Sequence, residues 1–186
     1  ATQASSAEIL VEAEGFASHG GWKLDTQFIE IMGSPYLLAH GLGKPVEDAS
    51  TTISIEEAGT YHVWVRTKDW AATFERKGSP GRFQIAIGGE ALDTEFGNES
   101  PEWAWQNGGT VELKPGEVEL ALKDLTGFCG RCDAIVLTTN PDFTPDNGNT
   151  PLPDWRRTML GLEVEPENAG DFDLVVVGGG YSGMGA

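Results

Sequence analysis

The sequence predicts an all-β chain: an antiparallel β-sandwich or jelly roll over residues 8–139, then a linker and one further strand with a glycine-rich turn. Three observations support this fold class. Short β-rich runs are separated by turn residues, several runs alternate apolar and polar side chains, and hardly any segment has helical periodicity. With 39 % hydrophobic and 22 % charged residues, the composition is typical of a soluble globular protein.

Seven runs of β-prone residues are the predicted strands of the sandwich. They cover residues 8–13, 51–56, 61–67, 82–87, 110–113, 117–123 and 132–138. In the third run Tyr61, Val63 and Val65 fall on one face, which is the period-two pattern of a half-buried strand. Residues 28–42 are apolar but irregular, and we expect a loop or a bent strand packed on the sandwich.

Residues 140–170 form the predicted linker. They include five prolines, which remove hydrogen-bond donors and stiffen the chain, so the segment should cross a surface in extended form. A short helix is predicted near residues 154–160.

Residues 171–186 carry a motif with a specific physical basis. An apolar run at 174–177 suits a buried parallel strand, and a GxGxxG pattern follows directly. In this context Gly178 permits a tight turn, Gly180 lets the backbone approach a pyrophosphate, and Gly183 lets the next helix pack on the strand. The pattern predicts the truncated start of a Rossmann-type, dinucleotide-binding domain, with a plain glycine-rich tail as the alternative.

The charge of the chain excludes two classes of partner. Its formal net charge is −17, from 12 Lys and Arg against 29 Asp and Glu, and such a surface repels nucleic acid and anionic membranes. No apolar run approaches the roughly 18 residues of a membrane helix. The small, polar residues 1–7 resemble either the terminus left by a removed signal peptide or a trimmed chain, so we expect an extracellular or periplasmic location.

Three segments of the sandwich resemble a known group of domains. They are Ala-Gly-Thr-Tyr-His-Val-Trp-Val-Arg at 58–66, Trp-Ala-Trp at 103–105 and Gly-Arg-Cys-Asp-Ala-Ile at 130–135. They resemble the carbohydrate-binding-like domains found beside xanthan lyases and golvesin-type proteins. The resemblance covers roughly residues 8–143 and implies a jelly roll of the galactose-binding type.

The last residues resemble a second group. The sequence Asp-Leu-Val-Val-Val-Gly-Gly-Gly-Tyr-Ser-Gly-Met-Gly-Ala at 173–186 resembles the start of FAD-dependent oxidoreductases, in which the glycine turn holds the FAD pyrophosphate. The resemblance implies FAD as the cofactor of a parent protein, of which this chain is expected to be a fragment.

Tryptophans are the first candidates for a ligand site, since flat aromatic rings can stack on the C–H faces of sugars. Trp103 and Trp105 lie two apart and share a face if the segment is extended. Trp70 lies in the long connection at 68–81, where binding residues often occur. The alternative for all three is that the rings fill the ends of the sandwich core.

Basic residues gather near Trp70. Five of the 12 Lys and Arg residues lie between positions 66 and 82. Arg76 and Arg82 could clamp the carboxylates of uronate sugars in bidentate fashion. The alternative is a solvated loop whose cations pair with the protein's own acids.

Glu12 and Glu14 lie two apart on the first predicted strand, so their carboxylates should point the same way. The resemblance implies more. In related carbohydrate-binding jelly rolls, a Glu-x-Glu strand near the N-terminus and an Asp near the last strand hold a structural Ca²⁺, and Asp133 matches that Asp. The alternative is an acidic pair that faces solvent.

The pattern Cys129-Gly130-Arg131-Cys132 runs into a predicted strand and lacks the helix N-terminus of a redox motif. A local disulfide and two free thiols both remain open.

Two functions fit these observations, and neither assigns a catalytic residue to the chain. The first is a non-catalytic module that binds a polysaccharide or oligosaccharide and belongs to an FAD-dependent oxidoreductase. The second is a structural domain without a ligand, which packs on the flavin domain of the same parent.

We expect the purified chain to be colourless and not to bind FAD. A dinucleotide site needs the helix after the glycine turn, an acidic residue about 20 positions further on and several neighbouring strands, and residues 171–186 supply one strand and one turn. Absorbance after incubation with FAD and dialysis measures this. Stoichiometric flavin in the dialysed protein would contradict the expectation.

Overall fold

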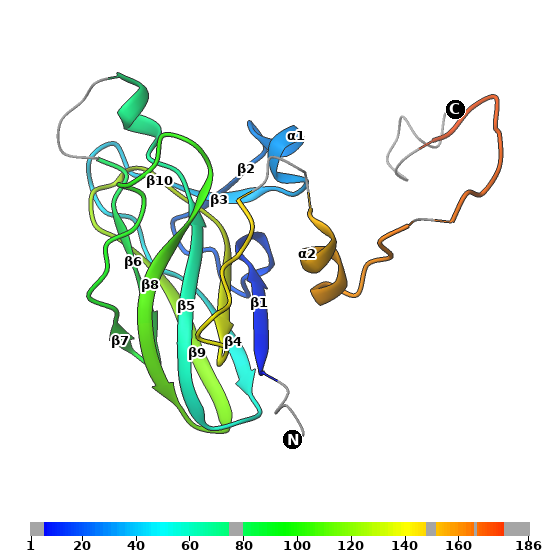
Figure 1. Ribbon diagram of the computed structural model, residues 1–186. Coiled ribbons are helices and arrows are strands. Elements are labelled where there is room, and N and C mark those ends of the chain that lie inside the picture. The colour runs from blue at the N-terminus through cyan, green and yellow to red at the C-terminus, as the bar shows by residue number, and fades with distance from the viewer. Residues whose placement is uncertain (1–5, 75–79, 148–151, 166, 177–186) are drawn as a thin grey trace.

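The chain folds into two antiparallel β-sheets packed as a sandwich (Figure 1). The computed structural model describes residues 6–74, 80–147, 152–165 and 167–176. Within them the larger sheet has six strands: β1 (Glu8–Glu12), β2 (Lys23–Asp25), β3 (Tyr36–His40), β5 (Gly59–Thr67), β8 (Ala104–Leu113) and β10 (Phe128–Thr138). The smaller sheet has four: β4 (Ala49–Ile55), β9 (Gly116–Asp124), β6 (Phe83–Ile87) and β7 (Glu90–Ala91).

β10 is the central strand of the larger sheet. It pairs with β5 along one side, and with β3 and then β1 along the other. All its residues after Phe128 are buried, because one face lies against the smaller sheet and the other is covered by further parts of the chain.

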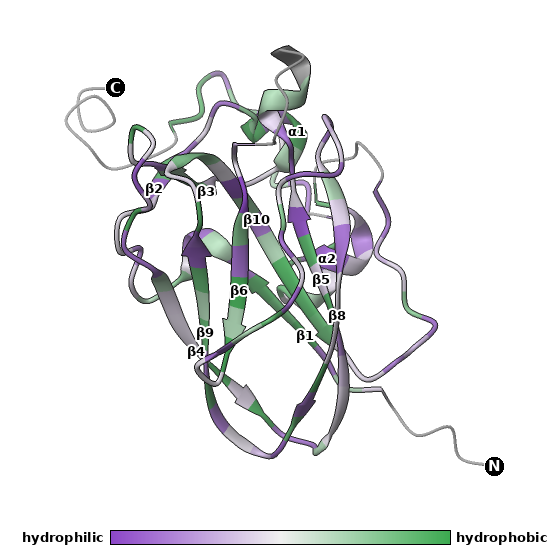
Figure 2. Cartoon of the chain, turned by 90° about the vertical axis from the view of Figure 1, so that its left-hand side faces the viewer, coloured by the Kyte–Doolittle hydropathy of each residue, from purple (hydrophilic) through white to green (hydrophobic). Residues whose placement is uncertain are grey.

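The main core fills the space between the two sheets. Tyr61, Val63 and Val65 of β5 are fully buried in it, as their period-two spacing predicts. Trp22 packs edge-on against Phe83, with 5.6 Å between ring centroids. Figure 2 shows hydrophobic residues concentrated along the strands around β10. The predicted all-β sandwich is therefore confirmed.

All seven predicted strands are present, and three short or irregular ones were not predicted individually. β2 and β7 have three and two residues, too few for any periodicity. The expectation for residues 28–42 is correct in part. β3 is a strand of the larger sheet, but a short helix, α1 (Ile29–Met32), precedes it and ends at Gly33 with φ 77°.

The predicted helix of the linker is present as α2 (Asp154–Met159). It lies against β1 at the edge of the sandwich (Figure 1). The linker therefore folds back onto the module before residues 160–165 and 167–176 run away from it (Figure 1).

The apolar run near the C-terminus has no partner strand among the described residues. Leu174 and Val175 are exposed and outside any strand. Val177 and the predicted turn glycines Gly178, Gly180 and Gly183 lie outside the described residues, so the Rossmann-type strand stays a prediction. Within the described residues, no helix has the length and hydrophobicity that crossing a membrane requires.

Candidate functional site

Three carboxylates meet on the outer face of the larger sheet. Glu12 ends β1, Glu14 lies in the 3-10 turn η1 (Ala13–Gly15), and Asp133 belongs to β10. One oxygen from each lies within 4.8 Å of the others. The three residues are therefore grouped as expected. One detail needs correction: Glu14 lies beyond the strand, so η1 and not period-two alternation places it beside Glu12.

A β-bulge in β10 orients Asp133. The register between β10 and β5 shifts between Cys132 and Ala134, which leaves Asp133 as the extra residue. A bulge of this kind bends the strand and re-aims a side chain. Cys132 packs in the main core and Ala134 on the outer face. Asp133 itself is fully buried, at 0 % exposure, and its charge must be met by neighbouring donors.

Two arginines supply those donors. Arg66 of β5 donates from Nη1 to Asp133 Oδ2 at 3.1 Å. Arg156 of α2 donates from Nη1 to the same oxygen at 2.8 Å, and from Nε to Glu12 Oε1 at 2.8 Å. Its Nη2 also bonds to Glu12 Oε2. Burial alone would lower the pKa of Arg156, but the bonds to Glu12 and the charge of Asp133 raise it, so the guanidinium stays charged.

Glu14 is the least compensated carboxylate of the three. Among the described residues, its buried Oε2 has no hydrogen-bond partner. Burial raises the pKa of Glu14 from 4.5 to about 7, and the charges of Glu12 and Asp133 add to the effect. Glu14 is therefore largely protonated below neutral pH, where the two remaining carboxylates balance the two arginines.

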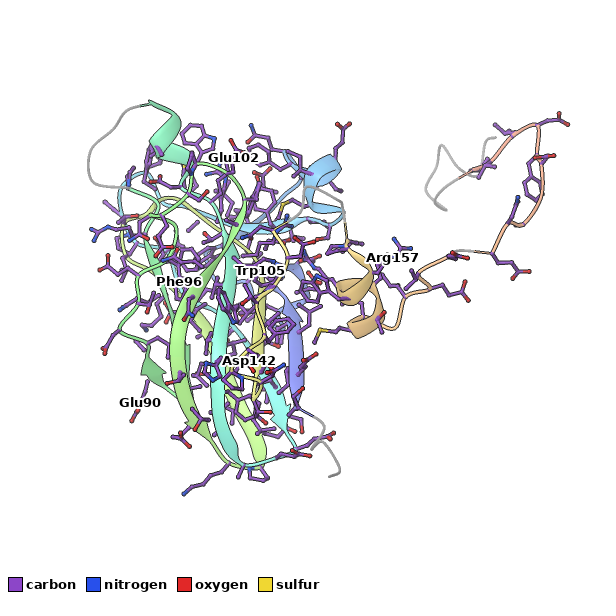
Figure 3. The ribbon with its side chains drawn as sticks, in the orientation of Figure 1. Glu90, Phe96, Glu102, Trp105, Asp142 and Arg157 are labelled. Atoms are coloured by element: carbon purple, nitrogen blue, oxygen red, sulfur yellow. The ribbon has the colours of Figure 1, made fainter. Side chains whose placement is uncertain are left out.

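Trp105, a predicted sugar platform, is buried under the linker at 6 % exposure. Its ring packs on Trp155 of α2 with 5.8 Å between centroids, and Phe143 packs on Trp155 at 5.9 Å. The Trp105 backbone N–H donates to Asn147 Oδ1 at 2.6 Å. Figure 3 shows Trp105 at the sheet face on the side of α2. In this conformation Trp105 is a core residue with no free face for a sugar.

Trp103 is buried in a different cluster, also at 6 % exposure. It packs with Met32, Tyr36 and Phe28, and its ring centroid lies 4.8 Å from that of Tyr36. Trp103 precedes β8, which begins at Ala104, so strand alternation does not relate it to Trp105. This corrects the expectation that the two rings share one surface.

Trp70 begins the 3-10 turn η2 (Trp70–Phe74). This turn lies between the end of β5 and the start of β6, at the end of the sandwich that we call the loop end. The guanidinium of Arg131 lies 5.1 Å from the centroid of its ring. Arg131 is buried and donates from Nη1 to the Cys129 carbonyl at 2.9 Å. Its buried Nε has no partner among the described residues. Trp70 is only partly buried, which sets it apart from Trp103 and Trp105.

Of the two arginines predicted to clamp a uronate, Arg82 lies within the described residues. Arg82 pairs with Glu95 at 2.6 Å, and both side chains are more than one-third exposed. Arg66 is committed to the carboxylate cluster, and the buried Lys68 donates to a backbone carbonyl. These three cations thus bond to the protein's own groups. Arg76 lies outside the described residues.

Both cysteines are buried and free. Of the two alternatives, a local disulfide or two free thiols, the structure therefore has the free thiols. Cys129 Sγ lies 3.5 Å from His40 Nδ1. Burial raises the pKa of the Cys132 thiol well above its usual value, which makes that sulfur unreactive.

Sequence reasoning missed Arg156 and Arg131 as site residues. Arg156 lies 144 positions from Glu12, and no local spacing connects them. The available signal was an aromatic and basic group, Trp-Arg-Arg at 155–157, in the middle of an otherwise proline-rich and acidic segment. Arg131 stands in the motif at 130–135, but nothing in that motif indicates a ring above it.

Known proteins resemble this chain in structure and not in sequence. No protein family matches the sequence, and no curated protein matches it. A Podospora anserina GH26–CBM35 β-(1,4)-mannanase aligns over 74 % of this chain, with a TM-score of 0.57 and 18 % identity. This chain covers only 29 % of the mannanase.

Two isolated modules align over nearly their whole length. A family 35 carbohydrate-binding module from Clostridium thermocellum has a TM-score of 0.53 and 16 % identity, with 70 % of this chain and 97 % of the module covered. The C-terminal CBM6 of a marine laminarinase from Zobellia galactanivorans has a TM-score of 0.51 and 18 % identity, with 71 % and 99 % covered. At such identities the likeness shows the jelly-roll fold, which confirms the predicted architecture.

Replacing Glu14 by Gln should remove one source of pH dependence. Because the folded state holds this proton more tightly than the unfolded state, its contribution to stability is complete below pH 4.5 and is lost as the pH rises to about 7. E14Q should therefore match the wild type at pH 4 and exceed it by about 1–2 kcal/mol at pH 8. Urea unfolding of both proteins from pH 4 to 8 measures the difference. Parallel stability curves would contradict it.

Proposed function

We propose that this chain is a non-catalytic carbohydrate-binding module of an FAD-dependent oxidoreductase, with a polysaccharide or oligosaccharide as its partner. The observation that carries the proposal is the jelly-roll likeness to solved carbohydrate-binding modules of families 35 and 6, with TM-scores of 0.53 and 0.51. Because polysaccharides are met mainly outside the cytoplasm, an extracellular or periplasmic location is part of the proposal.

The proposal assigns no catalysis to the module. The three-carboxylate cluster is the natural place to look for a general acid and base. There, however, two carboxylates are bound by Arg66 and Arg156. A carboxylate held in this way is covered by its partner, which suits a structural contact better than proton transfer.

The loop end is the place where we expect a sugar. The outer face of the larger sheet is occupied by the linker, since Trp155 lies on Trp105. At the loop end Trp70 is only partly buried, and Arg131 lies against its ring. A partly exposed aromatic ring can stack on a sugar, and the buried Arg131 holds this ring in place through a cation–π contact.

We expect the ligand to rest on the surface there. The hollow described beside this end, between residues 67–69 and 98–106, holds about 20 Å³, which is room for about one water molecule. A surface platform of this kind binds through a few stacked rings, so a single tryptophan should account for much of the affinity.

The FAD-dependent parent rests on the sequence alone. The apolar run and glycine turn at 174–183 support it, since a GxGxxG placed directly after an apolar strand is the pattern of a dinucleotide site. FAD would belong to the parent and bind beyond the module, so the module's own ligand and the cofactor would occupy separate sites.

A second candidate function is a structural domain that packs on the flavin domain of its parent. The observation in its favour is exposed apolar surface on β2 and α1, where Leu24, Ile29 and Ile31 are 53 %, 43 % and 39 % exposed. Apolar residues gathered on a surface can mark a contact with another part of the protein. A glycan array separates the two functions, because only the first predicts bound sugar.

We expect Trp70→Ala to weaken sugar binding several-fold while changing the melting temperature little. Stacking on a ring contributes about 1 kcal/mol or more beyond burial, whereas a residue of a loop turn supports little of the core. The matched control is Trp105→Ala, which removes a buried ring and should cost roughly 3–5 kcal/mol of stability. Calorimetry with a uronate-containing oligosaccharide or with a glycan identified on the array, together with thermal unfolding, measures both effects.

Two results would count against this site. A large fall in melting temperature for Trp70→Ala would make the residue part of the core. An unchanged melting temperature with unchanged affinity would remove Trp70 from the binding surface. Silence of the wild-type chain on the array would favour the structural domain instead.

A further inference from the structure

The side chain of Arg156 lies where a metal ion would have to bind. It is 1 % exposed, although it comes from the linker helix and not from the sandwich. Its three nitrogens bond to both oxygens of Glu12 and to Oδ2 of Asp133. The guanidinium thus bridges β1 and β10 at the point where the three carboxylates converge.

These contacts leave too few oxygens for calcium. Ca²⁺ takes six to eight oxygen ligands at roughly 2.3–2.6 Å. Arg156 uses both oxygens of Glu12 and shares Asp133 Oδ2 with Arg66, and Ser34 Oγ donates to Asp133 Oδ1 at 3.4 Å. Glu14 Oε2 is the one buried carboxylate oxygen of the cluster without a partner in the described chain. With Arg156 in place, the donor set does not fit the calcium that the resemblance implies.

The structure assigns the cation of this cluster to the chain itself: we propose that Arg156 takes the place of a metal ion. Arg156 and a divalent cation would compete for the same oxygens of Glu12 and Asp133. Two consequences follow. The wild-type module needs no calcium, and the linker helix α2 is held on the sandwich by its own charge.

Two further contacts make this docking specific. Trp155, the neighbour of Arg156, packs on Trp105, and Asn147 accepts a hydrogen bond from the Trp105 backbone. The aromatic contact and the charge contact lie next to each other in α2, so the helix places both at once. Apolar packing by Trp155 is the alternative explanation for the docked helix, and the experiment must therefore separate it from the charge contact of Arg156.

The test uses the full chain with Arg156→Gln and the matched control Arg157→Gln. Arg157 is the next residue of α2 (Figure 3), and its guanidinium bonds to the exposed Glu163 carbonyl at 2.9 and 3.1 Å. Both variants lose one positive charge at adjacent positions of one helix, but only R156Q removes a contact with the carboxylate cluster. Melting temperatures are measured in EDTA and at millimolar CaCl₂, with MgCl₂ as a control for ionic strength.

We expect calcium to leave the melting temperature of the wild type unchanged from its value in EDTA, and the same for R157Q. R156Q should melt several degrees lower in EDTA, because Glu12 then loses its partner and the buried Asp133 keeps Arg66 as its one cation. Calcium, but not magnesium, should recover part of that loss, since the vacated oxygens form a flexible site. Rescue by an added ion is the signature that a purely structural salt bridge would not give.

Three results would overturn the proposal. Calcium-dependent stability of the wild type would mean that a metal is the natural occupant. An R156Q variant as stable as R157Q would show that the helix packs without the charge. An R156Q variant that is destabilised and indifferent to calcium would remove the competition. If R156Q does not fold, R156K is compared with R157K, because a lysine keeps the charge but lacks the fork that bridges two carboxylates; calcium should then stabilise R156K and leave R157K unchanged.

Discussion

A carboxylate buried in the central strand is the constraint on which the rest of this structure depends. Asp133 has no exposed surface, and an unpaired charge in such a place costs several kcal/mol. Arg66 on the neighbouring strand supplies one partner at 3.1 Å. The second partner, Arg156, comes from outside the sandwich and binds Glu12 as well. Balancing Asp133 and Glu12 together therefore takes a second arginine, which the linker supplies by folding back onto the larger sheet.

The returning linker changes which surface can serve as a ligand site. It places Trp155 over Trp105 and Phe143 beside Trp155, so the outer face of the sheet becomes a second small core. Trp103 is buried in a third cluster, with Met32 and Tyr36. Of the three candidate rings, this leaves Trp70 with part of its surface in solvent. The location proposed for a sugar thus follows from electrostatics in the sheet as much as from the aromatic residues themselves.

Local patterns predicted most of the fold, and long-range contacts explain what they missed. The alternation of Tyr61, Val63 and Val65 needs only neighbouring residues, and it correctly indicated a half-buried strand. The pairing of Trp103 with Trp105 failed because β8 begins between them, so that alternation does not apply to the first ring. The carboxylate cluster was predictable through a resemblance, but its cation was not. Arg156 is separated from Glu12 by 144 positions, and only the folded linker brings them together.

An arginine and a metal ion can both neutralise buried carboxylates, but they bind the chain in different ways. A free ion holds only the strands that ligate it and leaves the linker independent of the sandwich. A guanidinium is covalently part of α2, so its effective concentration at the cluster is high and does not depend on the medium. The same bond also fixes where the chain leaves the module, since Arg156 stands near the middle of α2 (Asp154–Met159). Charge neutralisation and linker position are therefore one interaction in this protein, and a change that weakens the first must loosen the second.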